Sequence, residues 1–258
     1  MQFDDDLIAC ADLVRKGDPQ RFRAVMAAPV TARPALFALY AFNVELSRAP
    51  WASAESMIAE MRVQWWRDVG AEIAGGGPVR RHFVATPLAR VLPAHLATLI
   101  DPMAEARRWD IYRDPFEDEA ALDAYLEATS GALTWMAAAM LGAADEEVAR
   151  DFGYAVGVSK YLQAIPDLEA HKRIPLPDGR MEAVSALARK GLARLENARK
   201  TRAQISKAAS PAFLVGWETD ALLKQASDTP ERVADGTLGI GEFQTRCRLL
   251  WRTATGRW

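Results

Sequence analysis

Ala35-Leu-Phe-Ala-Leu-Tyr-Ala-Phe-Asn-Val-Glu-Leu-Ser-Arg48 is the stretch of sequence that decides the fold. One face of it carries residues at helical spacing, namely Leu36, Leu39, Tyr40, Asn43 and Ser47. Arg33-Pro34 precedes the stretch, and proline suits the first turn of a helix because its missing N–H needs no partner there. This pattern predicts a helix from near Arg33 to about Ser47.

Helical periodicity continues along the rest of the chain, and the alternation typical of strands is nearly absent. Alanine and leucine fill the long segments. We predict further helices over Asp5–Arg15, Ala54–Ile73, Thr86–Leu92, Ala94–Trp109, Leu122–Leu141, Asp145–Leu168, Met181–Lys207, Pro211–Ala226 and Gly241–Arg252. Because no internal repeat or long linker separates them, we expect one all-α bundle and a single domain over residues 1–258.

The composition is that of an ordinary globular protein, with 258 residues of which 50% are hydrophobic and 26% charged. A net charge of −2 argues against a dedicated nucleic-acid binder. No run of about 18 uncharged apolar residues occurs, so no membrane span is predicted. Cys10 and Cys247 lack the spacing of metal ligands, and the acidic start MQFDDDLIAC does not resemble a secretory signal. We therefore expect a cytoplasmic protein, with peripheral contact at the inner membrane face as a further possibility.

Four segments resemble the squalene/phytoene synthase family, in the order and at the separations of that family. Residues 35–48 resemble its first signature, an ALYAF-like helix that leads into an aspartate-rich motif. The other three are Met61-Arg-Val-Gln-Trp-Trp-Arg-Asp68, Tyr125-Leu-Glu-Ala-Thr-Ser-Gly-Ala132 and the run from Gly157 to Pro177. This resemblance covers residues from about 18 to 180. It implies an isoprenoid-synthase fold, an all-α bundle around a deep apolar cavity.

Three shorter segments are similar to one branch of that family, which contains the mitochondrial complex I assembly factor and its bacterial relatives. They are Phe42–Leu46, Met61–Trp65 and Pro211–Leu214. The similarity to this branch implies a role in assisting the assembly of a respiratory membrane complex.

The resemblance also indicates that the metal-binding aspartates are missing. Family enzymes hold Mg²⁺ with two pairs of aspartates, each pair four residues apart on one helix face, and the ions neutralise the departing diphosphate. The corresponding positions here are occupied by Ser47, Trp51, Ala164 and Leu168. None of these side chains replaces a carboxylate ligand, so we predict a catalytically degenerate site without a metal or other cofactor.

Residues that line the cavity in the family are candidates for substrate or ligand binding. They are Tyr40, Asn43, Ser47, Arg48, Lys160, Tyr161, Ala164 and Asp167. Arg48 and Lys160 could hold a diphosphate or an anionic head group directly. Alternatively they pair with Glu45 or Asp167 across the helix interface, which is favoured because buried charges need partners. Tyr40 is equally compatible with a core position.

An active Mg-dependent prenyltransferase that joins isoprenyl diphosphates stays open as an alternative, if nearby acids rebuild the site. Asp167 is rotated about 100° from Leu168 on the helix, and Glu45 about 200° from Ser47. Asp167 could reach a cavity rim, whereas Glu45 is expected to face another helix. A purely structural scaffold with a filled interior is a third reading.

A basic run occupies residues 189–207, where a single acid, Glu196, accompanies Arg189, Lys190, Arg194, Arg199, Lys200, Arg202 and Lys207. Such a helix can bind a membrane surface or an acidic respiratory-complex subunit, or it can be a solvated face. The expected ligand is an isoprenoid or lipid. The histidines, His82, His95 and His171, are predicted to be surface or capping residues, and one of Trp65 and Trp66 to point inward.

Overall fold

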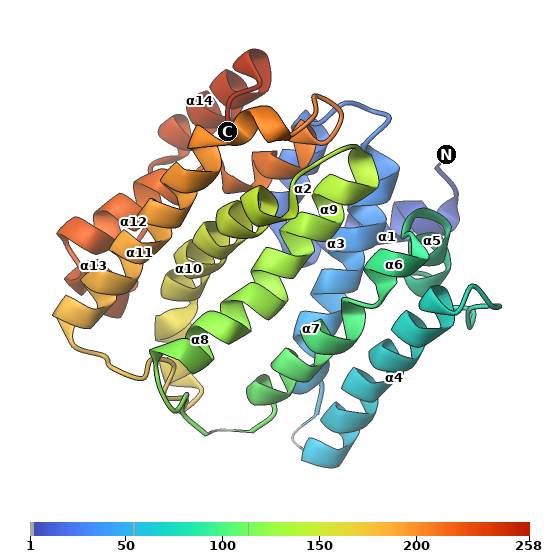
Figure 1. The fold of residues 1–258 in the computed structure, drawn as a ribbon. Helices are drawn as coiled ribbons and strands as arrows, with labels where there is room; N and C mark the ends of the chain where they lie inside the picture. Colours follow the sequence, from blue (N-terminus) through green and yellow to red (C-terminus); the bar gives the residue numbers. More distant parts are fainter. Residues whose placement is uncertain (1–2, 54, 113) are drawn as a thin grey trace. The chain divides into compact units, whose positions relative to one another are not determined.

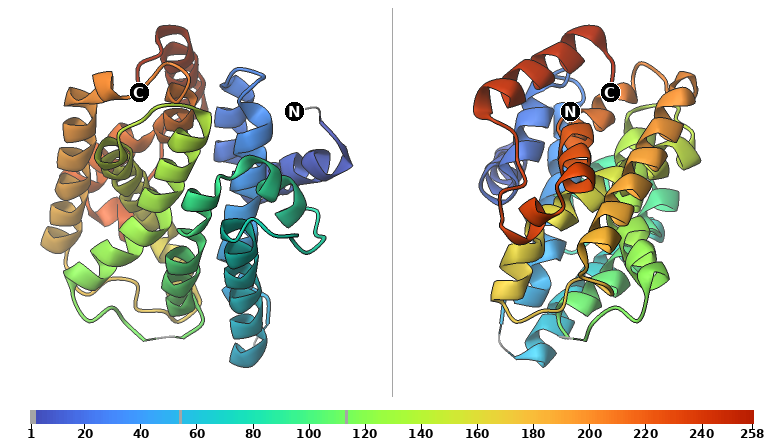
Figure 2. Two further views of the ribbon diagram at one scale, coloured as in Figure 1. Left: turned by 45° about the vertical axis from the view of Figure 1, so that its right-hand side comes forward. Right: turned by 90° about the vertical axis from the view of Figure 1, so that its left-hand side faces the viewer.

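The computed structural model describes residues 3–53, 55–112 and 114–258, and these residues form helices without any β-strand (Figures 1 and 2). Contacts along the chain define two compact units. Unit 1 comprises Met1–Tyr112, Met136–Gly142 and Lys207–Val215, and unit 2 comprises Arg113–Trp135, Ala143–Ser206 and Gly216–Trp258. The predicted all-α class is confirmed, whereas the single domain stays a prediction.

Unit 1 is built mainly from the first half of the chain. Its elements are α1 (Asp5–Gly17), α2 (Pro19–Ala27), α3 (Arg33–Arg48), η1 (Ala49–Trp51), α4 (Ser56–Ala74), α5 (Ala85–Val91), α6 (Ala94–Ala97), α7 (Ile100–Arg107) and η2 (Arg108–Asp110). Helix α3 is mostly buried and packs against α1 and α5. At Gly17, the last residue of α1, an added Cβ would lie 2.5 Å from Val44 Cγ1, so the approach to α3 requires glycine.

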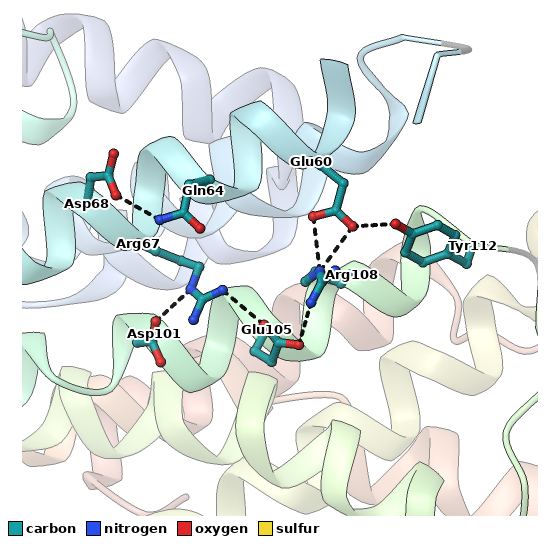
Figure 3. Close-up of polar contacts among 8 residues, drawn as sticks. All are labelled: Glu60, Gln64, Arg67, Asp68, Asp101, Glu105, Arg108 and Tyr112. Carbon is teal, nitrogen blue, oxygen red and sulfur yellow. Dashed lines mark hydrogen bonds and ion pairs between the residues drawn. The ribbon is translucent and has the colours of Figure 1, made fainter. Parts of the chain in front are cut away.

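Two arginines join α4 to α7 and η2 in unit 1 (Figure 3). Arg67 of α4 donates from Nε to Asp101 at 2.6 Å and from an NH group to Glu105 at 3.1 Å. Arg108 of η2 donates from Nε to both carboxylate oxygens of Glu60 at 3.0 Å. Arg108 also reaches Glu105 at 2.9 Å. The two guanidiniums therefore share Glu105 and form one network rather than two separate pairs.

Unit 2 contains the longest helix of the described chain, α10. Its elements are α8 (Glu119–Leu126), the π-helical segment η3 (Glu127–Gly131), α10 (Glu146–Ala170), α11 (Met181–Lys200), η4 (Arg202–Gln204), α12 (Thr219–Asp228), α13 (Glu231–Ala234) and α14 (Glu242–Thr255). Helix α9 (Ala132–Leu141) and η5 (Ser210–Gly216) each contribute residues to both units.

Helix α10 packs against α11, α12 and the π-helical segment. Glycines allow the closest of these approaches. An added Cβ at Gly157 would lie 2.8 Å from Ser130 Cβ, and one at Gly153 would lie 2.8 Å from Thr134 Cβ. The predicted helix 145–168 is confirmed, and it continues to Ala170 despite Pro166 in its last turns.

Two α-helices, α2 and the short α13, were not predicted. Gly17 ends α1, and the next two residues, Asp18 and Pro19, already begin α2. The Asp18 carboxylate accepts the Arg21 N–H at 2.9 Å, and Pro19 occupies the first helical turn. This is a side-chain N-cap followed by proline, the usual signature of a helix start.

Four predicted helices are interrupted or shorter than expected. The helix expected over 122–141 is divided into α8, the π-helical segment η3 and α9. The helix expected over 94–109 is divided into α6 and α7, and Thr98 Oγ1 donates to the His95 carbonyl at 2.7 Å near the break. The helix expected over 181–207 ends at Lys200, and the one expected over 211–226 begins with the 3₁₀ segment η5. The helix propensities of the amino acids do not distinguish a 3₁₀ turn from an α-helix where these helices end or are interrupted. No helix in the described residues is long and apolar enough to cross a membrane.

Candidate functional site

The four candidate residues of α3 lie in unit 1 and differ in burial. Tyr40 and Asn43 are buried, Ser47 is half-buried and Arg48 is exposed. Burial raises the pKa of the Tyr40 hydroxyl, and the guanidinium of Arg21 lies 5.5 Å from the centroid of its ring. Tyr40 is therefore a core tyrosine within this unit that stays protonated at neutral pH.

Ser47 occupies a position where the family resemblance expects a metal-binding aspartate. Its Oγ donates to the Val44 carbonyl of the same helix at 3.0 Å. Such a bond satisfies the hydroxyl within its own helix turn. Trp51 follows at the end of η1 and is 42% exposed. Neither side chain offers the anionic oxygen that Mg²⁺ prefers.

Arg48 lines a cleft of about 590 Å³ in unit 1, a volume in the usual range for small-molecule sites. The end of α3, η1, α4 and the segment before α5 form its walls. The lining residues are Glu45, Arg48, Ala49, Trp51, Ala52, Arg62, Trp65, Trp66 and His82. The cleft thus combines two guanidiniums, one carboxylate and four aromatic rings.

The two arginines of the cleft have no hydrogen bond or ion pair to any residue that the structure describes. The favoured prediction for Arg48, pairing with Glu45, is therefore wrong: both line the cleft, but their charged groups are not within ion-pair distance. Arg62 comes from α4, and sequence reasoning missed it because nothing in its local pattern marks it. Both guanidiniums keep their donors available to a ligand.

The aromatic wall of the cleft is held by packing between neighbouring rings. Trp66 is 3% exposed and Trp65 is half-buried, which confirms that one indole points inward. Their ring centroids are 4.8 Å apart, and that of His82 lies 4.9 Å from Trp65. His82 Nδ1 accepts the Val84 N–H at 3.2 Å, in the segment directly before α5.

The charge of His82 depends on the same packing. Desolvation lowers its pKa below the ordinary value of 6.5, and the cation of Arg81 acts in the same direction, while Glu45 opposes them. His82 is therefore neutral at pH 7. The formal charge of the cleft then comes from Arg48, Arg62 and Glu45, which leaves one positive charge in excess.

The four candidate residues of α10 lie in unit 2. The Lys160 ammonium is 3.9 Å from the buried carboxylate of Glu218 and donates to Gln163 at 3.3 Å. The Tyr161 hydroxyl donates to the Pro175 carbonyl at 2.6 Å. The predicted pairing of Lys160 with Asp167 is wrong, because Glu218 on the chain before α12 provides the buried carboxylate instead.

Asp167 and Ala164 complete the α10 set, with Ala164 half-buried. The Asp167 side chain is 83% exposed, and its carboxylate lies 3.7 Å from the ring nitrogen of His171. Among the described residues, no group of three or more histidine, cysteine or acidic side chains could hold a metal ion. Ser47 and Trp51 in unit 1, and Ala164 and Leu168 in unit 2, carry no carboxylate oxygen of the kind that Mg²⁺ prefers.

Acidic side chains of unit 2 form ion pairs with several basic residues of the run on α11. Lys190 pairs with Asp123, and Arg194 pairs with Glu127 and Asp151. Arg199 lies 3.8 Å from Asp220, and Lys200 lies 3.0 Å from Glu196. The basic run is thus in large part an internal ion-pair network.

Comparison with known proteins gives consistent matches. A family model described as squalene/phytoene synthase matches residues 14–238. The chain is 28% identical over 173 residues to NADH dehydrogenase (ubiquinone) complex I, assembly factor 6 of Bos taurus, and 27% identical over 173 residues to the protein of that name in Homo sapiens. Each match covers 65% of this chain and 52% of the relative, so the chain spans about half the length of these relatives.

Solved structures with the same fold include two synthases. A dehydrosqualene synthase in complex with ligand aligns over 97% of this chain and 96% of its own, with a TM-score of 0.78 at 13% identity. Squalene synthase HpnC from Alicyclobacillus acidocaldarius aligns over 88% of this chain and 94% of its own, with a TM-score of 0.72 at 16% identity. The predicted isoprenoid-synthase fold is confirmed by these likenesses, which at such identities concern the fold alone.

Proposed function

Because the chain belongs to the squalene/phytoene synthase family, we propose that it is a member that does not condense prenyl diphosphates and instead assists the assembly of a respiratory NADH dehydrogenase. Fold does not fix function, so the proposal depends on the residues at the reaction positions. A family enzyme needs carboxylates there to hold the ions that neutralise a leaving diphosphate.

The observation that carries the proposal is the chemistry at the four positions of the expected metal ligands. Ser47 bonds its own helix, Trp51 is an indole, and Ala164 and Leu168 are aliphatic. We infer that Glu45 and Asp167, which are close to these positions along the chain, do not replace them. Glu45 lines the cleft with two arginines, and the Asp167 carboxylate is exposed beside His171.

The partner is suggested by the relatives. Proteins from cattle and humans that are named as complex I assembly factor 6 share about a quarter of their aligned residues with this chain. Their names support a respiratory NADH dehydrogenase as the complex with which this chain acts.

A ligand role for the cleft of unit 1 fits the same proposal. Arg48 and Arg62 offer charge-assisted hydrogen bonds to an anionic head group, and the indoles of Trp65 and Trp66 offer an apolar wall. The proposed ligand class is an isoprenoid or lipid with an anionic head, held by guanidiniums instead of metal ions.

Titration calorimetry with farnesyl diphosphate in the presence of EDTA tests this ligand role. We expect metal-independent binding that weakens at least tenfold in the Arg48→Ala/Arg62→Ala variant. Arg202→Ala, which removes an exposed arginine of unit 2, is the matched control and should bind as the wild type does. Equal affinity of the wild type and the double variant would exclude the cleft.

The assembly role is tested by deleting the gene in the source organism and resolving the respiratory complexes on native gels stained for NADH oxidation. We expect loss of the assembled NADH dehydrogenase and its rescue by the wild-type gene. The Asp167→Ala variant should rescue equally well, because the exposed carboxylate has no catalytic task in this account. Normal assembly in the deletion strain would contradict the role.

The second candidate function is an active prenyltransferase that joins isoprenyl diphosphates with Mg²⁺. The observation that favours it is the likeness in fold to proteins named as squalene and dehydrosqualene synthases. This function would require metal ligands other than the four substituted positions, such as Asp167 or Glu45. Its distinguishing result is turnover that Asp167→Ala or Glu45→Ala abolishes.

A further inference from the structure

Helix α14 in unit 2 is attached to its neighbours by its polar face. Thr245 Oγ1 donates to Glu218 at 2.9 Å. Arg248 donates to Asp220 at 2.9 Å, and Arg252 lies 3.4 Å from the same carboxylate. The spacing of Thr245, Arg248 and Arg252 places them on one side of the helix. Hydrogen bonds and ion pairs, rather than an apolar stripe, therefore hold this helix in place.

The opposite face of α14 presents its large apolar side chains to solvent. Phe243 is 79% exposed, Leu250 is 70% exposed and Trp251 is 65% exposed. Cys247 is exposed beside them. Phe243, Cys247 and Leu250 follow one another at steps of four and three residues, and Trp251 follows Cys247 by four. All four side chains therefore lie on one face of the helix. An amphipathic helix of a globular protein normally turns this face inward, so the outward orientation marks a contact surface.

The charge around this face is positive. Residues 242–258 contain four arginines and one acid, Glu242. Asp220 lies within ion-pair distance of Arg199, Arg248 and Arg252, so one carboxylate serves three guanidiniums. Arg246 is exposed and pairs with Glu242. Hence the excess positive charge at α14 favours an anionic surface as its binding partner.

We propose that α14 docks unit 2 on the surface of a bilayer that contains anionic phospholipids. Phe243, Leu250 and Trp251 enter the boundary between head groups and acyl chains, and the exposed Arg246 and Arg257 bind lipid phosphates. A basic helix with tryptophan, phenylalanine and leucine on its apolar face is the composition of an interfacial helix. At 14 residues, α14 lies in the interface and does not cross the bilayer.

This proposal is independent of the cleft and of complex assembly. Its test is flotation of the full chain with vesicles of phosphatidylcholine alone and of phosphatidylcholine mixed with phosphatidylglycerol. We expect binding to the anionic vesicles that weakens with added salt. Phe243→Ser/Trp251→Ser should lower the bound fraction at least tenfold. Because both side chains are exposed, these substitutions leave the packed interior unchanged, and thermal unfolding checks this.

The matched control removes exposed apolar side chains from another helix. Met57 and Met61 on α4 are 74% and 67% exposed, and Met57→Ser/Met61→Ser should float as the wild type does. A second readout is quenching of Trp251 fluorescence by brominated phosphatidylglycerol, measured as the difference between the wild type and Trp251→Phe. Absence of wild-type flotation would overturn the proposal. An equal loss of vesicle binding in Phe243→Ser/Trp251→Ser and Met57→Ser/Met61→Ser would also overturn it. Binding of α14 to a soluble protein but not to vesicles would overturn it as well.

Discussion

The ammonium of Lys160 lies 3.9 Å from a carboxylate oxygen of Glu218, a side chain that also accepts the Thr245 hydroxyl. This relationship connects α10 with the start of α12 and with α14 inside unit 2. It also gives the lysine a structural task at a position where the family resemblance expected a ligand-binding residue.

Lys160→Met should destabilise the protein, because it leaves the buried Glu218 carboxylate without its cation. We expect a loss of about 1–3 kcal/mol in the free energy of unfolding, measured with urea. Lys160→Met/Glu218→Gln should lose less than the two single variants together, since the double change removes both charges. Lys200→Met disrupts an exposed pair and should cost less than about 1 kcal/mol. Additive single effects would contradict the coupling.

The α4–α7 network of Figure 3 predicts a contrast between two arginines of the same helix. Arg67→Ala removes contacts to Asp101 and Glu105 and should reduce the free energy of unfolding by about 0.5–1 kcal/mol, less at high salt. Arg62→Ala removes a guanidinium without an ion pair to any described residue, so we expect a change within about 0.5 kcal/mol. Urea unfolding at two salt concentrations measures both, and equal losses would refute the role of the network.

The close packing of α10 predicts that Gly153→Ala lowers the free energy of unfolding. The new Cβ would lie 2.7 Å from the Ser130 carbonyl oxygen and 2.8 Å from Thr134 Cβ, so backbone and side chain would both have to move. Overpacking of this kind costs about 1–3 kcal/mol. Gly77→Ala has nothing within 4 Å of the new atom and should be nearly neutral. Thermal unfolding of both variants checks this, and a neutral Gly153→Ala would show that the interface is looser than described.

Neutral His82 predicts that stability falls as the pH is lowered. Its pKa is depressed in the folded state, chiefly by desolvation, so below about pH 6.5 the unfolded chain binds more protons than the folded chain. The free energy of unfolding should therefore decrease from about pH 7 to about pH 5.5. His82→Gln should reduce this slope, whereas His95→Gln, an exposed control, should keep it. An unchanged slope in His82→Gln would contradict the assignment.

Local patterns were sufficient to predict the main helices but not the partners of the charged residues. The helix 33–48 could be predicted because proline, apolar spacing and length all indicate it. Lys160 could not be paired with Glu218 from sequence, because the two are distant along the chain and meet only through packing of α10 and the start of α12. For the same reason Arg62 and His82 were not assigned to the cleft of Arg48.

Helix α2 was not predicted because Gly17-Asp18-Pro19 both ends α1 and begins α2. Glycine and proline in succession indicate an interruption, and the interruption is real, but it lasts only for the cap residue between two helices. The orientation of α14 was also beyond sequence reasoning. Its pattern is amphipathic, and the pattern alone predicts the apolar face inward, whereas the contacts of Thr245 and Arg248 direct it outward.

Pyrophosphate release tests the proposed lack of catalysis most directly. The purified full chain is incubated with farnesyl and geranylgeranyl diphosphates, with and without Mg²⁺, beside an active synthase of the family. We expect no release above the protein-free blank, because the proposal assigns no metal ligand to Ser47, Trp51, Ala164 or Leu168. Mg-dependent release by the wild type that disappears in Asp167→Ala would contradict the account and identify the protein as an enzyme.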